Sequence, residues 1–196
     1  MKEKLKFVKI TRENIDFATE FQMSLFEGEC GYEHFLYTID SNNKYLSYYL
    51  VYLNNELVGI TGIYSFEQLE ETNSLWLGWF GLDPKYRGRG LGKQMLLDTL
   101  DIVKEYAKND DRIKYFRLYT STRNNPIACK LYREVMDIEE KYDYPGDFDY
   151  DGSCLIFTKI LDPNDQNKKW NNRFLNLNRI VEQEIEGGKV FLDKKF

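Results

Sequence analysis

The residues best suited to chemistry form a turn rich in glycine and arginine, Arg87-Gly88-Arg89-Gly90-Leu91-Gly92. Its alternate glycines let the main chain approach a ligand closely, because glycine has no side chain. The first amides of a helix have no acceptor within that helix, and the helix dipole makes this end electropositive. With two arginines in the turn and Lys93 directly after it, the segment predicts a site for a phosphate or pyrophosphate.

The turn lies between a predicted strand and a predicted helix. Leu75–Leu82 has no charged residue, contains two tryptophans and ends at Asp83-Pro84, as a central strand would. The apolar residues that follow the turn fall on one helical face, at Leu91, Met95, Leu96, Leu100, Val103 and Ala107. Neither nucleotide-binding pattern fits. The third glycine comes too early for GxGxxG, and Gln94 stands where GxxxxGK[ST] needs serine or threonine.

The spacing Arg87-x-x-Gly90-x-Gly92 resembles the R-x-x-G-x-G turn of the GNAT superfamily of N-acetyltransferases, which wraps the pyrophosphate of coenzyme A. A second pattern of that family, N-x-x-A-x-x-x-Y, is matched by Asn125, Ala128 and Tyr132. The resemblance implies that Asn125 contacts the pantetheine, that Ala128 leaves room for it, and that Tyr132 points its hydroxyl at the thioester sulfur. The alternative interpretation is two ordinary helix starts with packing roles.

The reaction implied by the resemblance is direct transfer of an acetyl group from acetyl-coenzyme A to a primary amine, with no metal. Main-chain N–H groups at Phe80, Gly81 and Leu82 would stabilise the oxyanion, and Gly81 would help the strand to bulge there. Tyr132 would return a proton to the departing thiolate. Many members of the family carry a glutamate where this chain has Gly78.

The base that accepts the amine proton stays open, because the predicted central strand has no carboxylate. The candidates are Glu29, Glu33, Asp143, or a water held by Thr120 or the main chain. We expect the single histidine, His34, at the surface or pocket edge of a second helix and not as a catalyst. The missing carboxylate also leaves a second function open, a coenzyme A-binding sensor or scaffold that no longer transfers.

The acceptor is predicted from an acidic segment, Asp137–Asp151, which carries seven acidic residues against one lysine. Tyr142, Tyr144 and Tyr150 are interleaved with these acids. Carboxylates and aromatic faces both attract cations, so we expect a small cationic amine or a basic peptide end as the acceptor. The alternative is a solvated hairpin loop in an acidic protein.

The composition excludes several classes of partner. A net charge of −5 and an isoelectric point near 5.1 argue against nucleic acid and anionic membranes. No apolar run reaches the roughly 18 residues of a membrane span, and the start of the chain lacks a secretory signal. Three widely spaced cysteines and a single histidine predict a cytoplasmic protein with reduced thiols and no histidine-rich metal site.

The predicted order of elements is β-α-α-β-β-β-α-β-α-β-β, an α/β fold with a mixed sheet and the topology of the GNAT family. Asn54-Asn55 predicts a hairpin, and the strands before and after the long helix should run parallel.

We expect residues 1–161 to form the acetyltransferase domain and residues 162–196 a C-terminal extension. In the extension, helical spacing is shown by Trp170, Phe174, Leu177, Val181 and Ile185, before Gly187-Gly188. This spacing predicts an amphipathic helix that packs on the domain or against a second subunit of a homodimer.

Overall fold

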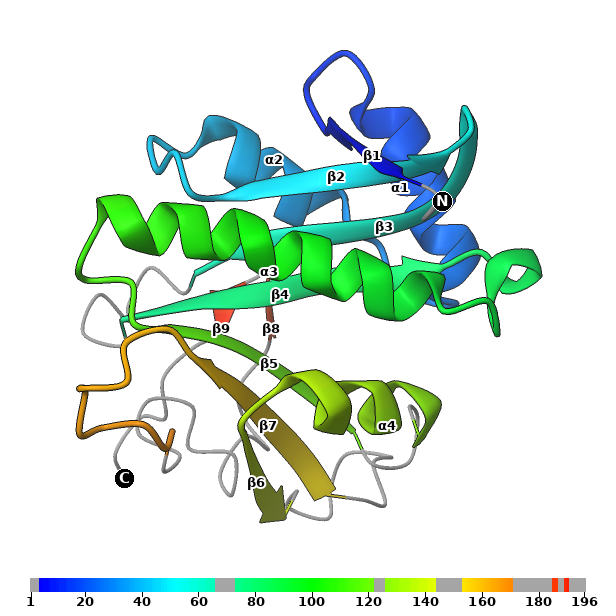
Figure 1. Cartoon of the computed structure of the whole chain (residues 1–196). Helices are drawn as coiled ribbons and strands as arrows, with labels where there is room; N and C mark the ends of the chain where they lie inside the picture. The colour runs from blue at the N-terminus through cyan, green and yellow to red at the C-terminus, as the bar shows by residue number, and fades with distance from the viewer. Residues whose placement is uncertain are drawn as a thin grey trace. The chain divides into compact units, whose positions relative to one another are not determined.

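The computed structural model describes residues 4–65, 73–121, 126–143 and 153–170, together with short strands at 185–186 and 189–190. The elements within these ranges are, in chain order, β1 (Leu5–Lys9), α1 (Ile15–Leu25), α2 (Tyr32–Asp40), β2 (Ser47–Leu53), β3 (Glu56–Tyr64), β4 (Ser74–Leu82), the 3-10 helix η2 (Pro84–Tyr86), α3 (Leu91–Asn109), β5 (Tyr115–Ser121), α4 (Pro126–Val135), β6 (Ile138–Asp143), β7 (Ser153–Ile160), β8 (Ile185–Glu186) and β9 (Lys189–Val190) (Figure 1). The predicted order of helices and strands is confirmed up to β7.

Seven of these strands form one mixed sheet in the order β1-β2-β3-β4-β5-β7-β6. Residues 74–76 of β4 pair with residues 115–117 of β5, and the two strands run parallel, as predicted. β7 lies between β5 and β6 and pairs antiparallel with both. The predicted α/β fold with a mixed sheet is therefore confirmed.

The chain forms two compact units. The first contains residues 1–64 and 77–106, and the second contains residues 65–76 and 107–196. β4 contributes to both, because its first three residues belong to the second unit and the others to the first. The glycine-rich turn and α3 up to residue 106 thus belong to the first unit, whereas α4 belongs to the second.

Helices cover both faces of the strands in the first unit (Figure 1). Successive side chains of a strand point to opposite faces. Leu50 of β2 packs in one cluster with Ala18 of α1 and Phe35 of α2. Val51, the next residue, packs in another cluster with Met95 of α3. One face of the hairpin is therefore covered by α1 and α2, and the other by α3.

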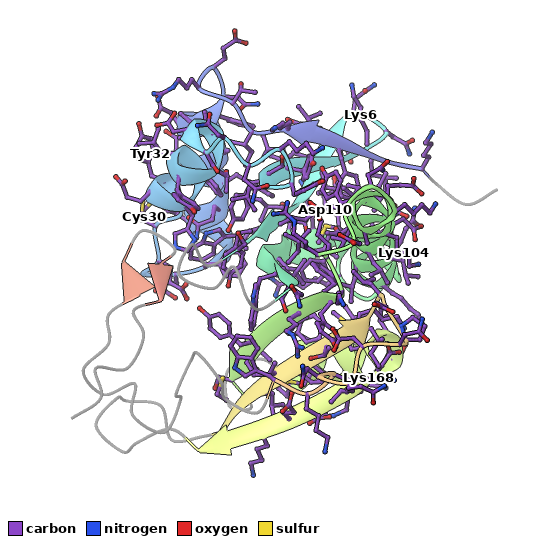
Figure 2. All side chains as sticks on the ribbon, turned by 90° about the vertical axis from the view of Figure 1, so that its left-hand side faces the viewer. Lys6, Cys30, Tyr32, Lys104, Asp110 and Lys168 are labelled. Carbon is purple, nitrogen blue, oxygen red and sulfur yellow. The ribbon has the colours of Figure 1, made fainter. Side chains whose placement is uncertain are left out.

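The helix α3 places its apolar stripe against the strands. The buried residues of this stripe include Leu91, Met95, Leu96, Leu100 and Val103, as the spacing predicted. Lys104 lies on the outer side of the helix, which Figure 2 shows end-on. Of the helices in the described ranges, none is long and apolar enough to cross a membrane.

The hairpin of β2 and β3 turns at Asn54 and Asn55, whose φ angles are +50° and +67°. These angles lie in the left-handed region, which asparagine tolerates better than most residues. Leu53 and Glu56, the residues on either side, are Cα partners. The predicted hairpin is therefore confirmed, with the two positive φ angles of a type I′ turn.

The second unit has α4 on one face of its strands and a later chain segment on the other. The ring centroids of Phe157 in β7 and Tyr132 in α4 lie 5.5 Å apart. Thr158 points to the opposite face, where its hydroxyl accepts a hydrogen bond from the Arg117 guanidinium at 2.6 Å. Trp170 lies against the same guanidinium, 5.4 Å from its ring centroid to Arg117 Cζ. The first part of the C-terminal extension therefore packs into the second unit.

The predicted helix from Trp170 to Ile185 is wrong at its C-terminal end. Ile185 lies in β8, where it is the Cα partner of Val190 in β9. The pair Gly187-Gly188, which the sequence suggested as a helix stop, is also a favoured connection for a two-residue hairpin. The β-branched residues on either side suit strands better than helices. Residues 171–184, which hold the rest of the predicted helix, lie outside the described residues.

Candidate active site

Two glycines of the turn before α3 have main-chain angles that favour glycine. The φ angle is +75° at Gly88 and +78° at Gly90, where a side chain costs roughly 1–2 kcal/mol. A Cβ atom at either position would meet no atom within 4 Å. The space beside both residues is therefore open. Glycine therefore allows the positive φ angles here and leaves the main chain accessible to a ligand.

Hydrogen bonds hold the chain that leads into the turn. The N–H of Asp83 donates to a carbonyl of β3 at 2.9 Å. The side chain of Arg87 donates through Nε to the carbonyl of Leu82 at 3.0 Å. Tyr86 is buried, and its hydroxyl donates to a carboxylate oxygen of Glu56. The turn is therefore anchored to the end of β4, to the hairpin and to the core.

The first turn of α3 offers main-chain amides to an anion. The earliest intrahelical hydrogen bond joins the Gln94 N–H to the Gly90 carbonyl at 3.2 Å. The amides of residues 91–93 precede it and have no carbonyl one turn earlier in the helix. Exposed cationic side chains near these amides belong to Arg87, Arg89 and Lys93. The structure thus brings the predicted residues 87–93 together in an arrangement that suits a phosphate.

The end of β4 has a main-chain irregularity, and it lies at Trp79. The φ angle of Trp79 is +42°, which is uncommon for a bulky side chain, whereas Gly81 has no such angle. The expectation that Gly81 lets the strand bulge stays a prediction, because a bulge does not require a positive φ angle. Gly81 also permits a close approach, since a Cβ atom there would meet the Phe26 ring at 2.9 Å.

The predicted oxyanion donors, Phe80, Gly81 and Leu82, are all partly buried. The N–H of Asp83 points toward β3, where Val58 accepts it. The three residues therefore directly precede a main-chain hydrogen bond that fixes the end of β4 to the hairpin.

His34 of α2 lies against this part of β4, which the sequence did not predict. Its ring and that of Trp79 meet edge to face, with centroids 5.2 Å apart. Phe26 contacts Trp79 in the same way, also at 5.2 Å. Burial lowers the pKa of His34 from 6.5 to about 4. His34 is therefore a neutral wall residue beside Trp79 at neutral pH.

The structure places the candidate bases in different parts of the chain. Glu29 and Glu33 belong to the first unit and are both exposed, although partial burial of the Glu29 carboxyl raises its pKa. Thr120 is a partly buried residue of β5 in the second unit. The side chain of Asp143 lies outside the described residues. This geometry therefore assigns the role of base to none of these residues.

In the second unit, α4 begins at Pro126, as predicted, and carries two of the expected cofactor residues. Ala128 is partly buried and Tyr132 is buried. Asn125, the third residue of the pattern, lies outside the described residues. Burial, followed by the nearby Cys129 thiol, raises the pKa of the Tyr132 phenol above its usual value of 10. Tyr132 therefore keeps its proton throughout the neutral range.

The depressed pKa of His34 predicts a loss of stability in acid. Below pH 6.5 the unfolded chain binds a proton at this residue, while the folded protein excludes it until about pH 4. The free energy of unfolding should therefore fall as the pH falls through this window, by roughly 3 kcal/mol in total. Urea unfolding of wild type and His34→Gln at pH 7 and pH 4.5 measures this effect. The variant should lose less stability than wild type, and identical losses would contradict the burial of a neutral imidazole.

Comparisons with known proteins bear on the family and the fold. A family model for the acetyltransferase (GNAT) family matches residues 13–137. The spermine/spermidine N(1)-acetyltransferase of Bacillus subtilis is 30% identical over 114 residues, which are 56% of this chain and 68% of that protein.

Solved structures also match, and at such low identity they show the fold alone. The spermidine N-acetyltransferase of Vibrio cholerae in complex with CoA and spermine has a TM-score of 0.56 at 16% identity, over 80% of this chain and 95% of that one. A GNAT-family acetyltransferase from Streptococcus pneumoniae has a TM-score of 0.57 at 18% identity, over 80% and 99%.

The family model covers more than half of the chain, and the curated relative is matched over more than two thirds of its length. The reaction of the family is acetyl transfer from acetyl-CoA to an amine. The chain therefore belongs to the GNAT family of acetyltransferases and is an acetyl-CoA-dependent N-acetyltransferase.

Proposed function

We propose that the acceptor is a polyamine or a similar small cationic amine. The observation that carries this proposal is a group of aromatic rings beside exposed carboxylates in the first unit. Phe26 and His34 both lie against Trp79. Exposed acids close to Phe26 and His34 in sequence, in and beside the connection between α1 and α2, are Glu27, Glu29 and Glu33. Aromatic faces and carboxylates both attract an ammonium group.

The relatives support a polyamine acceptor. The Bacillus subtilis protein is named for spermine and spermidine, and the Vibrio cholerae structure contains spermine together with CoA. The net charge of −5 also draws polycations toward this chain. A basic peptide end, the other acceptor expected from the sequence, would use the same carboxylates, so an acceptor panel must include one.

The acidic segment 137–151 supports this proposal less than the sequence suggested. Asp137 pairs with Lys159 at 2.7 Å, and Glu139 pairs with Arg133 through two bonds of 2.8 Å. Both carboxylates therefore already have cationic partners within the second unit. The remaining predicted acids of the segment, apart from Glu140, have side chains outside the described residues.

For the cosubstrate, we propose that the amides and cations of residues 87–93 bind the pyrophosphate of acetyl-CoA. Gly88, Gly90 and Gly92 would leave room for it, and Ala128 and Asn125 would contact the pantetheine. An amide in residues 80–82 would donate to the acetyl oxygen as negative charge develops there. Such donors typically lower the barrier by about 3–4 kcal/mol.

We propose Tyr132 as the acid that returns a proton to the thiolate. Its raised pKa keeps the phenol protonated, which is the state that a donor must have. His34 is not proposed as the base. A pKa of about 4 lies about six orders of magnitude below that of an alkyl ammonium, which opposes proton transfer by about 8 kcal/mol. His34→Gln should therefore keep its kcat within about threefold.

The cytoplasm is the proposed location, and cysteine chemistry supports it. Cys30, Cys129 and Cys154 are all free thiols in the described part of the chain. Free cysteines persist in reducing compartments. Alkylation of the protein from intact cells would measure whether all three remain reduced, and a disulfide between any two would contradict this location.

Substitution of Tyr132 by phenylalanine removes the proposed acid and keeps the ring that packs on Phe157. We expect kcat to fall by a factor of about 100 or more, because general acid catalysis typically contributes that much. The dissociation constant for CoA should stay within about twofold, since the hydroxyl is proposed to act on the thiolate. Steady-state kinetics with spermidine and calorimetry with CoA measure the two quantities. Unchanged turnover would show that Tyr132 is not the acid.

Neutralising Glu29 and Glu33 together tests the acceptor proposal. The Glu29→Gln, Glu33→Gln variant should raise KM for spermidine about tenfold or more and leave KM for acetyl-CoA unchanged, because both carboxylates are proposed to attract the polyamine. Glu13→Gln, an exposed acid before α1, is the matched control and should change neither constant. An acceptor panel of spermidine, a neutral amine and a basic peptide completes the test. Preference for the neutral amine would overturn the proposal, and preference for the peptide would replace the polyamine.

A further inference from the structure

A buried arginine in the second unit ties the segment after β7 to the strands. Arg117 of β5 is fully buried, and its guanidinium lies 4.4 Å from the centroid of the Tyr115 ring. It donates to Ser74 Oγ at 2.9 Å, to Thr158 Oγ1 at 2.6 Å and to the carbonyl of Lys168 at 3.2 Å. Lys168, which is labelled in Figure 2, lies beyond the end of β7. Because a buried cation is costly unless its donors are bonded, the guanidinium holds these partners in place.

Trp170 closes over this arginine from the same segment. Its side chain is fully buried, and its ring meets the Trp76 ring of β4 at 5.1 Å and nearly at right angles. The main-chain N–H of Trp170 donates to a carboxylate oxygen of Glu140 in β6 at 2.6 Å. Trp170 therefore contacts residues of three strands, Trp76 of β4, Arg117 of β5 and Glu140 of β6.

The position of these contacts along the strands is specific. The register of β4 with β5 contains three pairs and ends at Trp76 and Arg117. The side chains of both residues lie against the Trp170 ring. β5 continues in register with β7 as far as Ser121. Trp170 thus covers the last pair of the β4–β5 ladder.

We propose that Trp170 is a positioning residue for coenzyme A binding, which acts by fixing where the β4–β5 ladder ends. In the proposed site, the pantetheine would bond to main-chain groups beyond the last pair, and a shift of the ladder end would change which groups those are. Trp170 acts through Trp76 and Arg117, which its ring contacts. It lies beyond the residues 13–137 that the family model matches. The inference rests on the proposed position of the thioester beside the end of β4.

Calorimetry with coenzyme A on the full-length protein tests this role. Trp170→Ala should raise the dissociation constant at least tenfold at unchanged stoichiometry, because the folded molecules have a misplaced site. Trp170→Phe keeps a ring against Arg117 and Trp76 and should stay within about threefold of wild type. Leu50→Ala, a buried residue of β2 in the first unit, is the control for general destabilisation. It should reduce the stoichiometry, through loss of folded protein, without changing the dissociation constant.

Thr158→Val provides a milder test if Trp170→Ala does not fold. It removes one acceptor of the Arg117 guanidinium at nearly constant volume and should raise the dissociation constant about threefold. An unchanged dissociation constant in the variants that fold would overturn the role of Trp170. Failure of the wild-type protein to bind coenzyme A would instead overturn the proposed cofactor site, so the two results are distinguishable.

Discussion

The proposed site depends on the main-chain amides at the start of α3. These amides have no hydrogen-bond acceptor within the helix. A helix start binds an anion only when the chain before it stays in one conformation, because a mobile turn would have to be ordered by the ligand. Here Asp83, Tyr86 and Arg87 are each bonded to β4 or to the hairpin. Positive φ angles at Gly88 and Gly90 then direct the main chain into α3. Anion binding here requires both an ordered chain before the turn and open space beside the turn.

Each of the two units holds its own part of the proposed site in place. In the first unit, close contact of Phe26 with Gly81 and with Trp79 joins the α1–α2 connection to the end of β4. In the second unit, α4 packs on one face of the strands through Tyr132, while Trp170 packs on the other face. The segment after β7 thus covers that face of the strands at Trp170.

The elements that depend on local sequence could be predicted. The glycine turn, the stripe of α3 and the Asn54-Asn55 hairpin follow from spacing and from the conformational preferences of glycine and asparagine. Contacts between distant residues could not be predicted. The contact of His34 with Trp79 is one example, because nothing near His34 in the sequence indicates which ring lies against it. The burial of Trp170 against Arg117 could not be predicted either, because helical spacing relates only residues that are close in sequence.

One prediction failed because a pattern had two physical meanings. A pair of glycines ends a helix and also joins two strands, so Gly187-Gly188 could not distinguish a helix from the β8–β9 hairpin. Gly81 has a similar double meaning. A glycine in a strand marks either a bulge or a close approach, and the nearby Phe26 ring shows a close approach here.

Amide hydrogen exchange with and without coenzyme A tests the central claim most directly, because it reports on the main-chain groups themselves. Saturating coenzyme A should slow exchange of the amides in residues 90–93 about tenfold or more, and pantetheine, which lacks the pyrophosphate, should not slow them. Coenzyme A that binds by calorimetry but leaves these amides unprotected would contradict the claim that the start of α3 holds the pyrophosphate.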